Sequence, residues 1–347
     1  MGMSGVLHGG PDGGPVIRHD FSSNASPLGP PPALALALAN ADRQRYPDPS
    51  YGALREALAA AHGVAPARVL PTAGTSEAIR RLTLAVRLRG IATVWAPRPG
   101  YGDYAAAAHA LGLTVRTYDG EDALLQAVAD RADAALIWIC EPCNPTGSTL
   151  CDRFWAILGD AMRGSCSVLA LDRAYEPLRL VGRDPVPETI ATRAWQCVSP
   201  NKSLGLTGVR VGYLIAPRDD PLRLHADVEA LAPSWVLSAE GVALLCGLHA
   251  PQTQAWLAES RAILSLWAQH QRDMLARLGW IQRPSVVPFW LARPPGVVEL
   301  PGRLAVLREA GIKLRDATSL GLPGWVRVSA QPLASQLALR DAWVSFP

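Results

Sequence analysis

Residues 199–213 have the sequence Ser-Pro-Asn-Lys-Ser-Leu-Gly-Leu-Thr-Gly-Val-Arg-Val-Gly-Tyr, which holds Lys202 among small and apolar residues and Arg210 eight positions later. Desolvation disfavours the ammonium form of a lysine, so Lys202 can lose its proton more easily than a lysine in water. A lysine that forms a Schiff base needs this property. The alternative is a solvated lysine in a loop beside a strand, and the surrounding sequence has to distinguish the two.

The composition indicates a well-packed globular protein. Hydrophobic residues make up 49% of the 347 residues and charged residues 18%, enough for a large core or for a large and a small domain. A formal charge of +3 gives no reason to expect nucleic acid or a membrane surface as a partner. No apolar run approaches the ~20 residues of a membrane span. Residues 1–15 lack a signal pattern, so we expect a cytoplasmic protein.

Six cysteines are scattered along the chain, and Cys140 and Cys143 form a Cys-x-x-Cys motif. No second cysteine pair or histidine pair lies at the spacing of a zinc site. We therefore expect reduced, buried thiols and no metal, with a redox or metal role for this pair as the less favoured alternative.

Short apolar runs alternate with helical segments between residues 69 and 215. This alternation is typical of a mainly parallel sheet covered on both faces. We predict a large α/β domain with seven strands, at residues 69–71, 92–95, 113–115, 134–139, 168–171, 196–198 and 209–215.

Polar motifs stand where these strands end. In parallel sheets, ligands bind beyond the carboxyl ends of the strands. The residues that we expect at one such edge are Gly74, Thr75, Ser76, Tyr101, Asn144, Asp172 and Lys202.

The pattern changes on either side of this region. Residues 1–32 are rich in Gly and Pro and predict an arm instead of a packed element. Residues 33–235 form the predicted large domain. Residues 236–347 mix long helices with short strands, which predicts a smaller α+β domain.

Three motifs carry a resemblance to a known family: Asn144-Pro-Thr-Gly147, Asp172-Arg-Ala-Tyr175 and Ser199-Pro-Asn-Lys202. In this order, at successive strand ends, they resemble pyridoxal-phosphate-dependent enzymes of fold type I, the class I/II aminotransferases. The resemblance covers about residues 20 to 330. It implies an enzyme with pyridoxal 5′-phosphate as cofactor.

The resemblance also implies roles for single residues. Lys202 would form the Schiff base, and Asp172 would keep the pyridine nitrogen protonated. Asn144 and Tyr175 would donate to the ring hydroxyl oxygen, and Tyr101 would stack on the ring.

The cofactor phosphate needs amide donors at a helix N-terminus, which residues 74–76 (Gly74, Thr75 and Ser76) can supply. Ser199 and Arg210 match further phosphate ligands of the family. Tyr46 matches a tyrosine that reaches the phosphate of the neighbouring subunit, which implies a homodimer with sites at its interface. A buried tyrosine in a turn is the alternative for Tyr46.

Two positions depart from the family pattern. Asn201 stands where Ser or Thr usually precedes the lysine, and Arg173 stands where an acidic residue usually follows the aspartate. Because Asn201 can still donate to a phosphate, we expect an effect on cofactor affinity more than on activity.

Four residues bear on the substrate. Arg327 matches the arginine that binds the substrate carboxylate, and Arg315 resembles one that binds a substrate phosphate in the branch of histidinol-phosphate aminotransferases. The same branch contains threonine-phosphate decarboxylases of cobalamin biosynthesis. His8 (in His8-Gly9-Gly10) and Asn24 resemble the N-terminal substrate residues of those decarboxylases, although the spacer between the two motifs is short here.

Our preferred prediction is a threonine-phosphate decarboxylase-like lyase. A histidinol-phosphate-type aminotransferase is the alternative, because the two reactions differ only in which bond at Cα lies perpendicular to the ring. A third alternative is a non-catalytic sensor that binds pyridoxal phosphate. Such regulators carry an N-terminal winged-helix DNA-binding domain, whereas this chain starts with a short Gly/Pro arm, which argues against this alternative.

Overall fold

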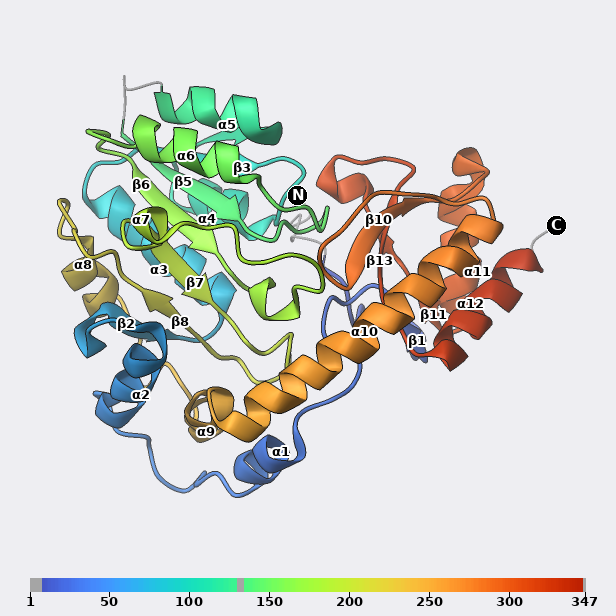
Figure 1. The fold of residues 1–347 in the computed structure, drawn as a ribbon, viewed down its shortest axis with the longest axis horizontal. Helices are drawn as coiled ribbons and strands as arrows, with labels where there is room; N and C mark the ends of the chain where they lie inside the picture. The colour runs from blue at the N-terminus through green and yellow to red at the C-terminus, as the bar shows by residue number, and fades with distance from the viewer. Residues whose placement is uncertain (1–7, 130–133, 346–347) are drawn as a thin grey trace.

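The structure is a computed structural model that describes residues 8–129 and 134–345. Its centre is a seven-stranded sheet in the order β2-β8-β7-β6-β5-β3-β4 (Figure 1). Strand β8 runs antiparallel to both of its neighbours, β2 and β7, and the other pairs in the sheet are parallel, so the predicted mainly parallel sheet is confirmed. The strands are β2 (Val69–Thr72), β3 (Thr93–Pro97), β4 (Thr114–Tyr118), β5 (Ala135–Cys140), β6 (Val168–Asp172), β7 (Trp195–Val198) and β8 (Gly212–Ile215).

Strand β5 explains why this sheet has helices on both faces. All six of its residues are buried. Leu136 and Trp138 point into one apolar cluster, whereas Ile137 and Ile139 point into another, as the two-residue period of a strand requires. The first cluster is covered by α3 (Thr75–Leu88), α4 (Asp103–Ala110) and α8 (Leu224–Ala230), and the second by α5 (Gly120–Ala129), α6 (Asp152–Ala161) and α7 (Glu188–Ala191).

A second, antiparallel sheet of four strands lies in the C-terminal part of the chain, in the order β12-β13-β10-β9. The long helix α10 extends from the large sheet to this smaller unit (Figure 1). The elements are α10 (Pro251–Arg277), β9 (Ile281–Gln282), β10 (Phe289–Arg293), α11 (Leu300–Glu309), β11 (Ile312–Lys313), β12 (Arg315–Asp316), β13 (Val326–Ser329) and α12 (Leu333–Val344). Four 3₁₀ turns complete the described chain, at Pro66–Arg68, Glu176–Leu178, Val297–Glu299 and Thr318–Leu320.

The predicted N-terminal arm is packed over much of its described length. The prediction of an unpacked arm therefore needs correction. Strand β1 (His19–Asp20) pairs in parallel with β11, and Phe21 is fully buried in the core of the small unit. Residues 1–7 of the predicted arm lie outside the described residues. The segment therefore belongs with the C-terminal part of the chain, because its strand neighbour is nearly 300 residues away in sequence.

The packing also does not follow the predicted boundary at residue 235. Helix α9 (Ala239–Leu248) lies in one apolar cluster with α1 (Pro32–Ala39), α2 (Gly52–His62) and strands β2 and β8. The first turns of α10 join the same cluster through Leu257, whereas Met274 and Leu275 pack in the small unit. The change from one core to the other therefore occurs within α10.

Residues 312–315 are divided between two sheets. β11 pairs with β1, and β12 pairs with β13, with Leu314 between them. A local pattern of residues could not reveal this division, because the two partners lie elsewhere in the chain. Within the described ranges, no helix is both long and apolar enough to cross a membrane.

Candidate active site

A cavity of about 410 Å³ lies beyond the carboxyl ends of the central strands. It brings together side chains from both ends of the chain and from the loops after β2, β3, β5, β6 and β7. The predicted site residues that line it are His8, Asn24, Thr75, Ser76, Tyr101, Asn144, Tyr175, Ser199, Lys202, Arg210, Arg315 and Arg327.

Lys202 lies in the turn that follows β7, and its Nζ atom is 5.2 Å from the centre of the Tyr175 ring. Its backbone carbonyl accepts a hydrogen bond of 2.8 Å from the amide of Ser26. The N-terminal segment therefore anchors the turn that presents the lysine to the cavity.

Asp172, the last residue of β6, is 3% exposed and is not one of the residues that line the cavity. Its carboxylate accepts hydrogen bonds from the Tyr104 hydroxyl at 2.7 Å and the Ala174 amide at 3.0 Å. Burial raises the pKa of this carboxyl, and the Tyr104 bond and the nearby Lys202 ammonium oppose the rise. A buried carboxylate of this kind favours a cationic group beside it.

Four polar side chains meet above the loop after β5. The Asn24 amide donates to Asn144 Oδ1 at 3.4 Å and to the Tyr175 hydroxyl at 3.3 Å. Arg327 donates from Nη1 to Asn144 Oδ1 at 2.6 Å and from Nη2 to the Ser22 carbonyl at 2.6 Å. This network joins the N-terminal segment, the large sheet and the small unit around one space.

The N-terminus of α3 forms a cradle for an anion. Gly74 has φ of 90°, in the left-handed region, and a Cβ atom there would lie 2.9 Å from the Arg210 guanidinium. Thr75 and Ser76 follow in the first turn, and Ser199 Oγ donates to the Val211 carbonyl at 3.0 Å. Amide donors, the helix dipole and Arg210 therefore converge, which suits a phosphate.

Tyr101 forms one wall of the cavity. Its hydroxyl donates to Asp103 at 2.8 Å and lies 2.9 Å from Ser76 Oγ. Burial raises the pKa of Tyr101 far above its ordinary value, and Asp103 adds to the rise, so the phenol stays protonated. The ring of His8 lies 5.8 Å from the Tyr101 ring, and His8 Nε2 lies 3.8 Å from Asp103 Oδ1.

Arg315 and Arg327 are directly opposite each other on β12 and β13. Each is 7% exposed, and burial lowers the pKa of both guanidinium groups, that of Arg327 to about 10. Arg315 donates to Ser319 Oγ at 2.7 Å. Like charges opposite each other on adjacent strands are unfavourable, so this pair is suited to an anionic ligand between them.

Tyr46 is outside this cavity and is 76% exposed, so it is not the buried turn tyrosine of the alternative interpretation. Its ring stacks on Trp235 with the ring centres 4.2 Å apart. An exposed aromatic pair of this kind is available to a second molecule.

The two departures from the family pattern have different positions. Asn201 lines the cavity, and its Oδ1 accepts from Ser199 Oγ at 3.1 Å. Arg173 instead forms ion pairs with Asp184 and, at 3.7 Å, with Glu176. The guanidinium that replaces the usual acidic residue is therefore neutralised outside the cavity.

Sequence reasoning missed Asp103 and Tyr104, which position Tyr101 and Asp172. Their closeness to Tyr101 in sequence was the available signal. Cys140 and Cys143 have thiol pKa values raised by burial and form no disulfide. No group of three His, Cys, Asp or Glu side chains that could hold a metal occurs in the described part of the chain.

Fold and site together define a fold type I enzyme with a Schiff-base lysine candidate at the carboxyl edge of its sheet. The chain belongs to the aminotransferase class I and II family, whose model matches residues 18–341. This confirms the predicted resemblance, fold class and enzyme class, and it supports pyridoxal 5′-phosphate as the cofactor.

Curated relatives include histidinol-phosphate aminotransferases from Shouchella clausii (29% identical) and Rhodospirillum rubrum (31% identical). Each alignment covers 89% of this chain and 84% of the relative. A similar solved structure is histidinol-phosphate aminotransferase from Sinorhizobium meliloti with pyridoxal-5′-phosphate (TM-score 0.81, 23% identical, 94% of this chain and 89% of that one). Another is L-threonine-O-3-phosphate decarboxylase from Porphyromonas gingivalis (TM-score 0.76, 23% identical, covering 94% of this chain and 98% of that one).

Proposed function

We propose that this chain is a pyridoxal-phosphate-dependent aminotransferase that acts on a small phosphorylated amino substrate, of the histidinol-phosphate type. The observation that carries the proposal is the pair Arg315 and Arg327, buried and directly opposite each other on the wall of the cavity that also holds Lys202. Two guanidinium groups at this place suit a carboxylate and a phosphate presented by the substrates.

The residues present fit the cofactor. Several polar atoms around the cavity are buried with no hydrogen-bond partner among the described residues, including Thr75 Oγ1 and Asn24 Oδ1. Buried polar atoms are rarely left unpaired, so these atoms suit a polar ligand. The glycine cradle at Gly74 and the guanidinium of Arg210 would hold the phosphate, and Asp172 would hold a proton on the ring nitrogen.

When bound, pyridoxal phosphate supplies a carbonyl that combines with amines and a ring that withdraws electrons from Cα. Lys202 would take the proton from Cα of the substrate, the step that distinguishes transamination from decarboxylation. Tyr101 would cover one face of the ring, and Arg327 would orient the carboxylate of the co-substrate 2-oxoglutarate.

The relatives favour this aminotransferase reading over the lyase that the sequence analysis preferred. The curated relatives at 29–31% identity are named histidinol-phosphate aminotransferases, and each covers about nine-tenths of this chain. The decarboxylase remains a second candidate because of one observation. His8, Gly9 and Gly10, which match the decarboxylase motif, line the cavity.

We also propose that the protein is a cytoplasmic homodimer in which the partner subunit's Tyr46 completes the phosphate site. Tyr46 and Trp235 form an exposed stacked pair away from the cavity of their own chain, which supports a contact with a second subunit.

The chain offers a sharp test of the cofactor lysine, because it contains only two lysines, Lys202 and Lys313. Borohydride reduction of the loaded protein should attach the cofactor to the peptide with Lys202, and Lys202→Ala should abolish both the label and the visible absorption band. Lys313, ion-paired with Asp12 at 2.8 Å, is the internal control. Label on Lys313 alone, or no visible band, would refute the proposal.

The reaction is tested with two substrates. Histidinol phosphate with 2-oxoglutarate should yield glutamate. Carbon dioxide from threonine phosphate, without glutamate from the first pair, would favour the decarboxylase. A cofactor spectrum that shifts with amino acids but yields neither product would favour a sensor.

A further inference from the structure

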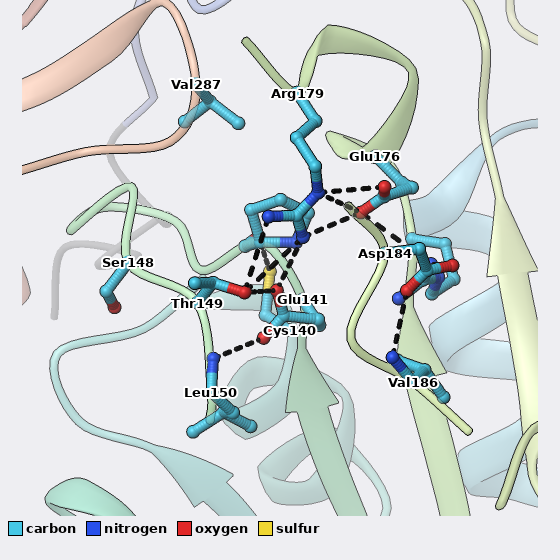
Figure 2. A network of polar contacts seen from close by, with 12 residues as sticks. Cys140, Glu141, Ser148, Thr149, Leu150, Glu176, Arg179, Asp184, Val186 and Val287 are labelled. Carbon is cyan, nitrogen blue, oxygen red and sulfur yellow. Dashed lines mark hydrogen bonds and ion pairs between the residues drawn. The ribbon is translucent and has the colours of Figure 1, made fainter. Parts of the chain in front are cut away.

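The Glu141 carboxylate is an acidic group buried next to the candidate site and not part of it. Glu141 is 0% exposed and follows β5 directly, three residues before Asn144. It accepts hydrogen bonds from Arg179 Nη2 at 2.8 Å, from the Leu150 amide at 2.9 Å and from the Thr149 hydroxyl (Figure 2). A carboxylate removed from water in this way is unfavourable unless such partners are present.

Its partner Arg179 comes from the loop after the next strand, β6. Arg179 lies four residues after Tyr175, past the 3₁₀ turn Glu176–Leu178. Its side chain is 6% exposed and also binds Glu176, with Nε to Oε1 at 2.9 Å and Nη2 to Oε2 at 2.9 Å (Figure 2). One guanidinium therefore connects the loop that carries Asn144 to the turn that carries Tyr175.

The charged groups around Arg179 are two guanidinium groups, including that of Arg173, and three carboxylates, including that of Asp184. Glu141 and Glu176 face Arg179, and Arg173 contacts Glu176 at 3.7 Å. Neither Glu141 nor Arg179 lines the cavity. Burial raises the pKa of the Glu141 carboxyl, and its hydrogen bonds from Thr149, Leu150 and Arg179 lower it again.

A buried ion pair is weak evidence of stabilisation, because the loss of hydration offsets much of the attraction between its charges. Its partners instead impose a particular geometry on the segments that they join. The two segments joined here carry Asn144 and Tyr175, which both contact the Asn24 amide at the cavity.

We propose that the Glu141–Arg179 ion pair is a positioning device that holds Asn144 and Tyr175 at the donor distance required by the ring oxygen of the bound cofactor. This inference rests on the proposed function. Donors at that oxygen stabilise its charged form, so their position sets the pH at which the cofactor absorbs as the acidic or the basic species. Loss of the ion pair should therefore change that titration.

The experiment uses the full-length protein loaded with pyridoxal phosphate. Glu141→Gln and Arg179→Met are compared with wild type for the pH midpoint of the visible band, the cofactor dissociation constant and the melting temperature. We expect each variant to raise the midpoint by about one pH unit and to weaken cofactor binding by about tenfold, because the donors retreat from the charged oxygen. Combining both substitutions should add little, because they break the same contact.

Arg183→Gln is the matched control, since Arg183 forms an exposed ion pair with Asp152 (83% and 73% exposed) in the same region. It should leave the midpoint unchanged. Thr149→Val removes a donor to Glu141 while preserving size, and it should shift the midpoint in the same direction by less, even if Glu141→Gln fails to fold.

A lower melting temperature with an unchanged midpoint in Arg179→Met and Thr149→Val would overturn the inference and leave only a structural ion pair. Failure of the proposed function looks different, because wild type itself would then lack the visible band.

Discussion

Under the proposed function, Arg327 is the residue on which substrate recognition should most depend. It is buried, it lies opposite Arg315, and its two terminal nitrogens already bind Asn144 and the Ser22 carbonyl. Its planar guanidinium group would thus hold a carboxylate in only one orientation, and its geometry is coupled to Asn144, which would face the cofactor.

Arg327→Lys keeps the charge but removes the fork. We expect kcat/KM for the carboxylate-bearing substrate to fall about 100-fold, or about 2.7 kcal/mol, because a bidentate contact and a buried hydrogen bond are lost together. Steady-state kinetics measures this change. Arg340→Lys, on an arginine that is 46% exposed, is the control and should behave as wild type. An Arg327→Lys enzyme with unaltered kcat/KM would contradict the role.

At the scale of elements, the N-terminal segment is held to the small unit and reaches over the cavity. Asp12 forms ion pairs with Arg308 and Lys313, both at 2.8 Å, and Lys313 also donates to the Gly10 carbonyl. Gly9 packs so closely that a Cβ atom would lie 2.0 Å from the Ser22 carbonyl oxygen. These contacts therefore fix the position of the segment, and this position puts residues 8–11 at the cavity.

Asp12→Asn should weaken the attachment of the N-terminal segment to the small unit. We expect KM for the phosphorylated substrate to rise about threefold to tenfold, with the unfolding free energy almost unchanged, because exposed ion pairs contribute little to global stability. Kinetics and chemical unfolding measure the two effects. Asp341→Asn, at an exposed pair on α12, should change neither quantity. A large stability loss without a change in KM would assign Asp12 to folding alone.

His62, the last residue of helix α2, makes a contact that should depend on pH. His62 Nε2 lies 2.7 Å from the hydroxyl of Tyr213, a fully buried residue of β8. Burial of the imidazole, and then repulsion from His249, lower the pKa of His62 to about 4. The neutral ring is the form that accepts from Tyr213, whose own pKa is raised by burial.

Because the folded pKa lies below the unfolded value of about 6.5, the folded state binds fewer protons between these values, and its stability should fall as pH drops from about 6.5 to 4. His62→Gln retains an acceptor without a titration, so its melting temperature should decline less over this range. Thermal unfolding at several pH values tests this. His109→Gln, at an exposed position of α4, should leave the wild-type slope unchanged; an equal slope in His62→Gln would argue against the contact.

At the scale of the whole molecule, the proposed homodimer should have a mass of about 74 kDa, twice the 37.0 kDa of one chain. Tyr46→Phe should weaken pyridoxal-phosphate binding about tenfold, or about 1.4 kcal/mol, because one hydrogen bond to a charged phosphate is lost. Sedimentation and cofactor titration measure these quantities.

Mixed dimers decide whether Tyr46 acts across the interface. A dimer of one Lys202→Ala chain and one Tyr46→Phe chain should contain one intact site, formed by Lys202 of one subunit and Tyr46 of the other. Mixing the two variants should therefore restore tight cofactor binding and activity. No restoration in dimers that demonstrably exchange subunits would place Tyr46 in the site of its own chain.

Much of the architecture could be predicted from local patterns. The apolar run of β5 and the polar residues after β3, β5, β6 and β7 indicated the sheet and its ligand-binding edge, because strand and helix periods are properties of neighbouring residues. The N-terminal segment was predicted poorly. Its Gly and Pro content indicated an arm, whereas β1 finds its partner in β11, at the other end of the chain.

The sequence by itself determined the class of chemistry: Lys202, Asp172 and Asn144 stand at strand ends, and the parallel order of the strands carries those ends to one edge. Only the tertiary structure decided which charges meet. The opposition of Arg315 and Arg327 depends on the register of β12 and β13, and the bond between Glu141 and Arg179 on the spacing of two loops. Such pairings arise from packing between distant segments, and no local period of the sequence encodes them.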